Sequence, residues 1–285
     1  MAAKYQNLQE QWAICGGLPI HFWTSRNAEY PGGPTLIHLH GFGISGSYLL
    51  PTADLLAAEY RSFVPDLPGY GRSIHPERVL SISDLAEAVV QFMDVVGVDT
   101  ATLIGNSMGC IVAIETARIV PERIERLVLV SPAGGRYNRP IFKGVAQLAL
   151  DGLRESPRMF TIAVPDYLRF GLINAGRLFW QMIHYPTVDR FRETEAETLV
   201  IVGERDPLVS EERIVEGTKV NTRIQIVRVG GAAHAINYSH PAKLAHLVRS
   251  FLQDEPLEDD GVSKGTAVVL RRLVLQVDRA ATSID

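Results

Sequence analysis

Short apolar runs alternate with amphipathic stretches along most of the chain. The run at residues 35–40, TLIHLH, and the runs RLVLV and TLVIV further along show little regular polar alternation. Strands of this kind are buried on both faces, as in a parallel sheet that is covered by helices. Strand and helix patterns that alternate with short linkers predict right-handed βαβ units. The chain is therefore predicted to form an α/β fold.

Glycine, proline and capping residues set the predicted boundaries of several elements. The glycines at residues 16–17 separate two strand-like runs and predict a hairpin. Ser81 and Asp84 begin a stretch with helical spacing, and Ser-x-x-Asp is typical of a helix N-terminus. A later helix, after residue 107, is expected to end near Pro121.

Two stretches interrupt the alternation. Residues 134–195 carry no strand pattern and are rich in aromatic residues and Met, which predicts a helical insertion. The division predicted is an α/β core of residues 1–133 and 196–256, a helical lid of residues 134–195, and a C-terminal extension of residues 257–285. An acidic stretch (DEPLEDDG) followed by TAVVLRRLVLQV predicts a linker and one short element of undetermined type, which ends in the apolar run LRRLVLQV. Contact with the lid or formation of a homodimer is a hypothesis for this run.

Amino-acid composition and charge exclude several classes of function for this chain. Apolar residues make up 46% of the 285 residues and charged residues 21%, which is typical of a globular protein of this size. A net charge of −4 without a basic run argues against a nucleic-acid partner. No run approaches the roughly 18 apolar residues of a membrane span, and the N-terminal residues do not resemble a signal peptide, so a cytoplasmic location is expected. Cys15 and Cys110 have no metal-ligand spacing.

The strongest chemical signal is the pentapeptide Gly105-Asn106-Ser107-Met108-Gly109. It follows a predicted strand and precedes a predicted helix. A turn this tight needs small residues on both sides of the serine, and it holds the serine in a strained backbone conformation. Amide groups at the start of the helix can stabilise developing negative charge. Ser107 is therefore the candidate nucleophile, because an ordinary serine in a glycine-rich loop fits this context less well.

A second glycine-rich segment follows an earlier strand, at residues 40–43 (HGFG). Acyl transfer needs two hydrogen-bond donors directed at the oxyanion. One comes from the residue after the nucleophile, which is Met108, and the other from a loop after an earlier strand. The backbone N–H of Phe42 is the second candidate, although HGFG could also be a simple glycine turn.

A serine nucleophile needs a base, and the base needs a carboxylate that holds its tautomer. Asp206 follows the strand ETLVIVG, and His234 follows the strand RIQIVRVGG. The carboxyl ends of parallel strands lie at one edge of a sheet, so both residues are expected beside Ser107. Glu204 lies two residues before Asp206 and remains an alternative acid.

Other histidines fit the role of base less well. His38 lies within a predicted strand, His40 is expected to shape the glycine-rich loop, and His240 precedes Pro241 at the predicted start of the last helix.

Five segments in this order resemble the α/β-hydrolase fold superfamily, from about residue 10 to residue 254. They are HGFG (40–43), DLPGYGRS (66–73), GNSMG (105–109), GERD (203–206) and GGAAH (230–234). The resemblance implies a mainly parallel eight-stranded sheet with helices on both faces and a helical lid between the strands RLVLV and TLVIV. It gives DLPGYGRS a structural role. Relatives with an aspartate nucleophile are excluded by Ser107.

The resemblance implies a serine-dependent hydrolase of carboxylic esters or lactones that needs no metal or organic cofactor. The aromatic lid suggests a small to medium apolar acyl group as the small-molecule substrate, and an acyl-homoserine lactone is one candidate. An alternative is a C–C bond hydrolase of dienone acids, whose pocket should hold an arginine such as Arg169 or Arg177. Those enzymes usually carry a larger residue after the catalytic histidine, where this chain has Ala235, and Cys110 stands where many relatives have glycine. A non-catalytic ligand receptor on the same fold is the alternative from another class.

Overall fold

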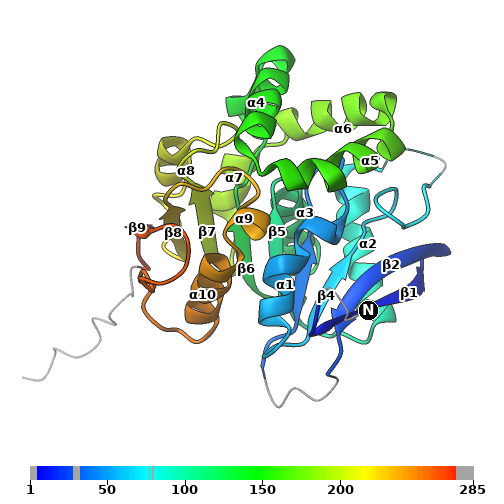
Figure 1. Cartoon of the computed structure of the whole chain (residues 1–285), viewed down its shortest axis with the longest axis horizontal. Helices are drawn as coiled ribbons and strands as arrows, with labels where there is room; N and C mark the ends of the chain where they lie inside the picture. The colour runs from blue at the N-terminus through cyan, green and yellow to red at the C-terminus, as the bar shows by residue number, and fades with distance from the viewer. Residues whose placement is uncertain (1–4, 28–32, 77, 79, 274–285) are drawn as a thin grey trace, which may run out of the picture.

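The fold is a twisted sheet with helices on both faces (Figure 1). The computed structural model describes residues 5–27, 33–76, 78 and 80–273. The described residues form one nine-stranded sheet in the order β1-β2-β4-β3-β5-β6-β7-β8-β9. The strands are β1 (Leu8–Cys15), β2 (Leu18–Ser25), β3 (Leu36–Leu39), β4 (Ser62–Pro65), β5 (Ala101–Asn106), β6 (Ile124–Val130), β7 (Glu197–Gly203), β8 (Ile224–Val229) and β9 (Ala267–Arg271).

The predicted mainly parallel sheet is confirmed. Strands β3 to β8 run parallel, whereas β1, β2 and β9 pair antiparallel at the two edges. The predicted hairpin at residues 16–17 joins β1 and β2. The described part has nine strands and not eight, because residues of the C-terminal extension add β9 to the free edge of β8.

Helices cover both faces of the sheet, which explains why its strands are apolar throughout. On one side lie α2 (Ile82–Val95), α3 (Met108–Ile119) and α8 (Glu211–Gly217); on the other lie α1 (Leu50–Leu56), α9 (Ile236–Ser239) and α10 (Pro241–Leu252). Successive strand residues enter opposite layers: Leu103 packs with α2 and α3, and its neighbour Ile104 packs with α10. Alternation of side chains along a strand therefore places apolar residues in both cores.

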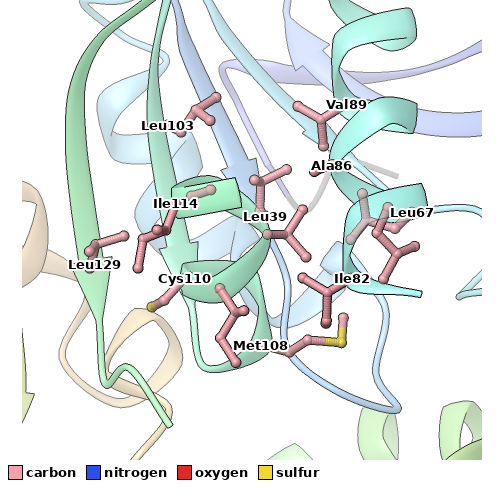
Figure 2. Close-up of a cluster of buried hydrophobic side chains, with 14 of the residues drawn as sticks. Leu39, Leu67, Ile82, Ala86, Val89, Leu103, Met108, Cys110, Ile114 and Leu129 are labelled. Atoms are coloured by element: carbon pink, nitrogen blue, oxygen red, sulfur yellow. The ribbon is translucent and has the colours of Figure 1, made fainter. Parts of the chain in front are cut away.

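The first turns of α3 are held by the core beneath them. Figure 2 shows Met108, Cys110 and Ile114 of α3 among side chains of the strands and of α2. Met108 and Cys110 are completely buried. Helix α2 begins with the predicted capping box, in which Ser81 and Asp84 each accept a hydrogen bond from the other's backbone N–H. Packing against α2 and the strands therefore fixes the start of α3, and with it Ser107.

Two glycines allow this helix to approach the sheet. A Cβ atom on Gly109 would lie 2.1 Å from the carbonyl oxygen of Leu39 on β3. A Cβ atom on Gly105 would lie 2.4 Å from the carbonyl oxygen of Gly109. Real Cβ atoms do not approach backbone atoms so closely, so only glycine fits these two positions. The predicted need for small residues around Ser107 has this physical basis.

The segment DLPGYGRS packs as a structural loop after β4. The carboxylate of Asp66 accepts hydrogen bonds from the N–H groups of Gly46 (2.8 Å) and Arg72 (3.0 Å) and contacts Nδ1 of His21 at 2.9 Å. Burial opposes the charge on Asp66, but these contacts keep the pKa of its carboxyl below the ordinary value. Ser73 Oγ donates to the carbonyl of Asp66 at 2.6 Å. The loop is therefore closed around one buried carboxylate.

Residues 134–195, all described, contain helices and no strand. They form η3 (Gly135–Asn138), α4 (Ile141–Arg154), η4 (Pro157–Met159), α5 (Phe160–Phe170), α6 (Leu172–His184) and α7 (Thr187–Glu193). In Figure 1, α4, α5 and α6 lie together beyond one end of the sheet. Aromatic rings join this helical insertion to the core: Phe170 stacks on Tyr70 with ring centroids 4.6 Å apart, and Phe42 lies between Tyr167 and Phe179.

The C-terminal extension docks on the core through charge as well as through β9. Lys243 of α10 is completely buried, and its ammonium group contacts Asp259 at 3.0 Å and also Asp260. Arg271 at the end of β9 donates to the carbonyl of Asn221 at 2.6 Å. The hypothesis of a homodimer or of a contact with the lid rests partly on residues 274–277, which lie outside the described residues.

The close approach at Gly109 predicts that Gly109→Ala is destabilising. The added methyl group meets rigid backbone, so the free energy of unfolding should fall by about 2–3 kcal/mol. Gly176→Ala is the matched control, because Gly176 lies within α6 with open space around the position of its Cβ; it should gain roughly 0.5–1 kcal/mol from helix propensity. Urea denaturation measures both changes. A Gly109→Ala protein as stable as the original would contradict this packing.

Candidate functional site

Ser107 lies at the sharp turn between β5 and α3. Its backbone has φ +57° and ψ −117°, a conformation that side-chain-bearing residues rarely adopt. The turn is held by a hydrogen bond of 3.0 Å from the Ser107 N–H to the carbonyl of Val130 on β6. The residue is 8% exposed. The strain predicted for this serine is therefore present, and the core packing around α3 maintains it.

His234 and Asp206 lie side by side. Nδ1 of His234 donates to Oδ2 of Asp206 at 2.8 Å, and the Asp206 side chain is completely buried. The other carboxylate oxygen, Oδ1, accepts from the N–H of Leu208 at 2.8 Å, which fixes the carboxylate plane. In the neutral imidazole, a proton on Nδ1 leaves the lone pair of Nε2 free. Nε2 is buried and makes no hydrogen bond with any described residue, including Ser107.

The structure distinguishes between the two candidate acids. Glu204 accepts a hydrogen bond from the N–H of Gly231 at 2.8 Å, at the exposed side of the loop that precedes His234. Asp206, and not Glu204, is the partner of the imidazole. The other two histidines have the positions expected of them: His38 lies in β3, and His240 is the N-cap residue of α10, directly before Pro241.

The loop at residues 40–43 lies against Ser107. A Cβ atom on Gly41 would lie 3.2 Å from the Cβ of Ser107. His40 shapes this loop as predicted: its Nδ1 donates to the Gly41 carbonyl at 2.9 Å, and its Nε2 accepts from the N–H of Leu67 at 3.0 Å. The side chain of Phe42 packs under the helical insertion. Met108 is the first residue of α3, so its N–H belongs to the first turn, which has no intrahelical acceptor.

Two polar residues that sequence reasoning missed connect these segments. Tyr48 accepts from the N–H of Gly41 at 2.8 Å and donates to Oδ1 of Asn106 at 2.5 Å. The Asn106 amide donates to the carbonyls of Val130 (3.0 Å) and His234 (3.2 Å). One network therefore joins the glycine-rich loop, the serine turn and the histidine loop. Asn106 lies inside the recognised pentapeptide, whereas nothing local marks Tyr48.

Sequence reasoning also missed two carboxylates of the helical insertion, one on α4 and one just after its end. Asp151 accepts from the backbone N–H of His234 at 3.3 Å, and Glu155 accepts from the N–H of Ala235 at 2.6 Å. Asp151 is only 7% exposed, and Oε2 of Glu155 is buried without a hydrogen-bond partner among the described residues. Asp151 lies in the last turn of α4, and Glu155 is the residue directly after this helix. The helical insertion is thereby attached to the loop that carries His234.

Burial and charge set the protonation of this cluster. Burial lowers the pKa of His234, but Asp206, Asp151 and Glu155 outweigh this effect and raise that pKa to about 9. Burial raises the pKa of Asp151 to about 6, because the attraction of His234 does not compensate for it. Burial also raises the pKa of Glu155 above its ordinary value. The site therefore favours a protonated imidazole at neutral pH in the ligand-free protein.

A cavity of about 600 Å³ opens over Ser107 and His234. Its floor comes from the core and its walls from α4, α5 and α6, with predominantly apolar side chains. In the described part of the chain, the residues that line it include no Lys or Arg; the charged residues are Asp151, Glu155 and His234. Arg169 and Arg177 are exposed and are not among the lining residues, so the arginine expected for a dienone acid is missing from this wall.

The described residues contain no group of three or more His, Cys, Asp or Glu side chains placed to hold a metal ion. None of their helices combines the length and the apolar character needed to cross a bilayer.

Parts of this chain are similar in sequence or structure to known proteins. Over 122 residues it is 32% identical to a pimeloyl-[acyl-carrier protein] methyl ester esterase of Photobacterium profundum, covering 43% of this chain and 46% of that protein. Over 212 residues it is 27% identical to a 2-hydroxy-6-oxo-6-phenylhexa-2,4-dienoate hydrolase of Burkholderia cepacia, covering 62% and 73%. A solved structure described as Est816, an N-acyl homoserine lactone degrading enzyme, superposes with a TM-score of 0.68 at 22% identity, covering 85% and 100%.

The extent of these matches differs. The chain spans less than half the length of the first three curated relatives that it matches. The solved structure shares the fold at low identity. The model of the alpha/beta hydrolase family, in contrast, matches residues 36–247, which include Ser107, Asp206 and His234. With its nine-stranded sheet and the serine turn between β5 and α3, the chain belongs to the alpha/beta hydrolase family.

Proposed function

We propose that the protein is a serine hydrolase of neutral carboxylic esters or lactones with an apolar acyl group. One observation carries the proposal: Ser107 and the hydrogen-bonded pair of His234 and Asp206 line the same apolar cavity, where no described lining residue is a Lys or Arg. In this proposal, residues 134–195 are the lid domain on a core of residues 1–133 and 196–256, and residues 257–285 are an extension of that core.

The proposed reaction proceeds through an acyl-enzyme. Oγ of Ser107 attacks the carbonyl carbon of the ester while Nε2 of His234 takes the hydroxyl proton. The N–H groups of Phe42 and Met108 donate to the oxyanion of the tetrahedral intermediate. His234 then protonates the leaving alcohol, and a water molecule, deprotonated by the same Nε2, releases the acid. Asp206 orients the imidazole and stabilises its charged form.

The lining of the cavity supports a neutral substrate. An anionic dienone acid would bring its carboxylate next to Asp151 and Glu155, where the described lining offers no Lys or Arg to pair with it. An ester or lactone carries no such charge, and its apolar acyl chain matches the walls of α4 and α5. An acyl-homoserine lactone, the substrate named for the solved structure above, fits this description. Ester hydrolysis is therefore preferred to C–C bond hydrolysis for this chain.

The first test is turnover of p-nitrophenyl esters from acetate to dodecanoate, with Ser107→Ala in parallel. The original protein should prefer one range of chain length, set by the cavity. The variant should lose roughly 10³- to 10⁶-fold in kcat, because no other group supplies the nucleophile. Absence of turnover of every ester by the original protein, or a full rate in the variant, would reject the proposal. Ligand binding without turnover would instead favour a receptor.

A matched pair of substitutions tests the acid. Asp206→Asn should reduce kcat roughly 10³- to 10⁴-fold, because an amide no longer holds the proton on Nδ1 of His234. Glu204→Gln should change kcat little, because Glu204 contacts only the loop backbone at Gly231. Circular dichroism of both variants checks that the fold is retained. An equal loss in the two variants would contradict the assignment of Asp206.

The pH dependence tests the base. A base must be neutral to accept a proton, and nearby carboxylates raise the pKa of His234 to about 9. The kcat/KM of the free protein should therefore rise with pH through the alkaline range. Asp151→Asn removes one negative charge, so the pKa of His234 should fall and the rising limb should move to lower pH. Asp189→Asn, on exposed α7, is the control and should leave the profile in place. Identical profiles for all three proteins would contradict the role of Asp151.

A further inference from the structure

The outer surface of the helical insertion carries apolar side chains that nothing covers. Leu153 is 83% exposed, Leu168 78% and Phe142 73%. Single exposed apolar residues are common in proteins, whereas a cluster of them marks a surface that binds something. The exposed apolar face consists of Phe142, Val145, Leu153, Phe160, Val164 and Leu168.

These residues lie on two neighbouring helices. On α5, Phe160, Val164 and Leu168 follow one another at intervals of four residues, which places them on one side of the helix. The helices meet near Gly152 of α4, where a Cβ atom would lie 4.0 Å from the Phe160 ring. In Figure 1 both helices lie at the end of the molecule away from the sheet.

The exposed apolar face is continuous with the cavity above Ser107. Five of its six members also line that cavity: Val145, Leu153, Phe160, Val164 and Leu168. These side chains therefore form the mouth through which an apolar ligand would reach the serine. A ligand held in a surface that covers the mouth could enter without crossing water.

Exposed arginines lie near this face in the sequence. Within residues 134–184, all of which the structure describes, Arg154, Arg158 and Arg169 are exposed and stand within two residues of members of the face. Arg154 also donates to the Arg205 carbonyl at 2.6 Å, and Arg169 pairs with Asp166 at 3.6 Å. The acidic residues of the same segment are Asp151, Glu155 and Asp166, and none of them is exposed. The surface of residues 134–184 is therefore cationic, although the exposed acids Asp189, Glu193 and Glu195 follow within the insertion and the whole chain has a net charge of −4.

We propose that the exposed apolar face docks on an anionic lipid surface and opens the cavity toward it. Apolar side chains would enter the acyl region while the arginines contact phosphate groups. A second copy of the chain is a poorer occupant, because a two-fold contact would bring the same arginines of both copies together, and residues 134–184, which form this part of the described structure, present no exposed acid to pair with them. Docking requires no hydrolysis, so it can fail or succeed independently of the proposed ester hydrolase.

The test is co-sedimentation of the full chain with two kinds of vesicle: phosphatidylcholine alone, and phosphatidylcholine mixed with phosphatidylglycerol. The apparent affinity for the mixed vesicles should be on the order of tenfold higher or more, and high salt should reduce it. The double substitutions Leu153→Ser/Leu168→Ser and Arg154→Gln/Arg158→Gln should each weaken binding by roughly tenfold or more. Val220→Ser is the matched control, because Val220 is 75% exposed but lies outside the insertion.

Each outcome bears on the proposal. Preference for the mixed vesicles that both double variants lose, and that Val220→Ser retains, supports it. No binding to either vesicle, equal binding to both, or binding unchanged in the double variants would overturn it. Sedimentation velocity provides a separate outcome: a dimer that dissociates in Leu153→Ser/Leu168→Ser would assign the face to a second copy and would also overturn the proposal.

Discussion

The site depends on how closely α3 approaches the sheet. Gly109 lies where any side chain would collide with the Leu39 carbonyl, and Gly105 lies where it would collide with α3 itself. This contact forces the chain to turn within one residue, and Ser107 takes the strained conformation that results. The apolar side chains of α3 stabilise the arrangement by burial, since the strain must be offset elsewhere. The position of the proposed nucleophile is therefore a consequence of core packing.

Charge balance is the second constraint. One imidazole, that of His234, lies among the carboxylates of Asp206, Asp151 and Glu155. Asp151 of α4 and Glu155, which directly follows α4, both belong to the helical insertion, so the insertion contributes directly to the electrostatics of the proposed base. A movement of α4 away from the histidine loop would break two backbone hydrogen bonds and at the same time lower the pKa of His234. The position of the helical insertion and the basicity of the proposed base are thus physically coupled in this chain.

Much of this arrangement could be predicted from sequence, because its signals are local. Short sequence segments with strict backbone requirements specify the turn at Ser107 and the strand ends before Asp206 and His234. Tyr48 and Asp151 could not be found in this way, since they meet the site only through tertiary packing. The short element predicted in the extension could not be assigned as a strand for a related reason: its apolar run pairs with β8 only because that edge of the sheet is free.

For the helical insertion, amino-acid composition does not predict which apolar side chains are buried and which are exposed. Its aromatic and aliphatic residues look alike in sequence, yet the structure separates them into a surface buried against the core and a surface exposed to solvent. Phe170 is buried against Tyr70, whereas Phe142 and Leu168 face outward. Residues that only packed the insertion onto the core would all be buried and would form no exposed surface. An exposed apolar surface lowers the solubility of a protein, so its presence is best explained by a binding role. Residues of α4 and α5 line the cavity above Ser107 and also form the exposed apolar face. The same helices therefore control access to Ser107 and carry the proposed docking surface.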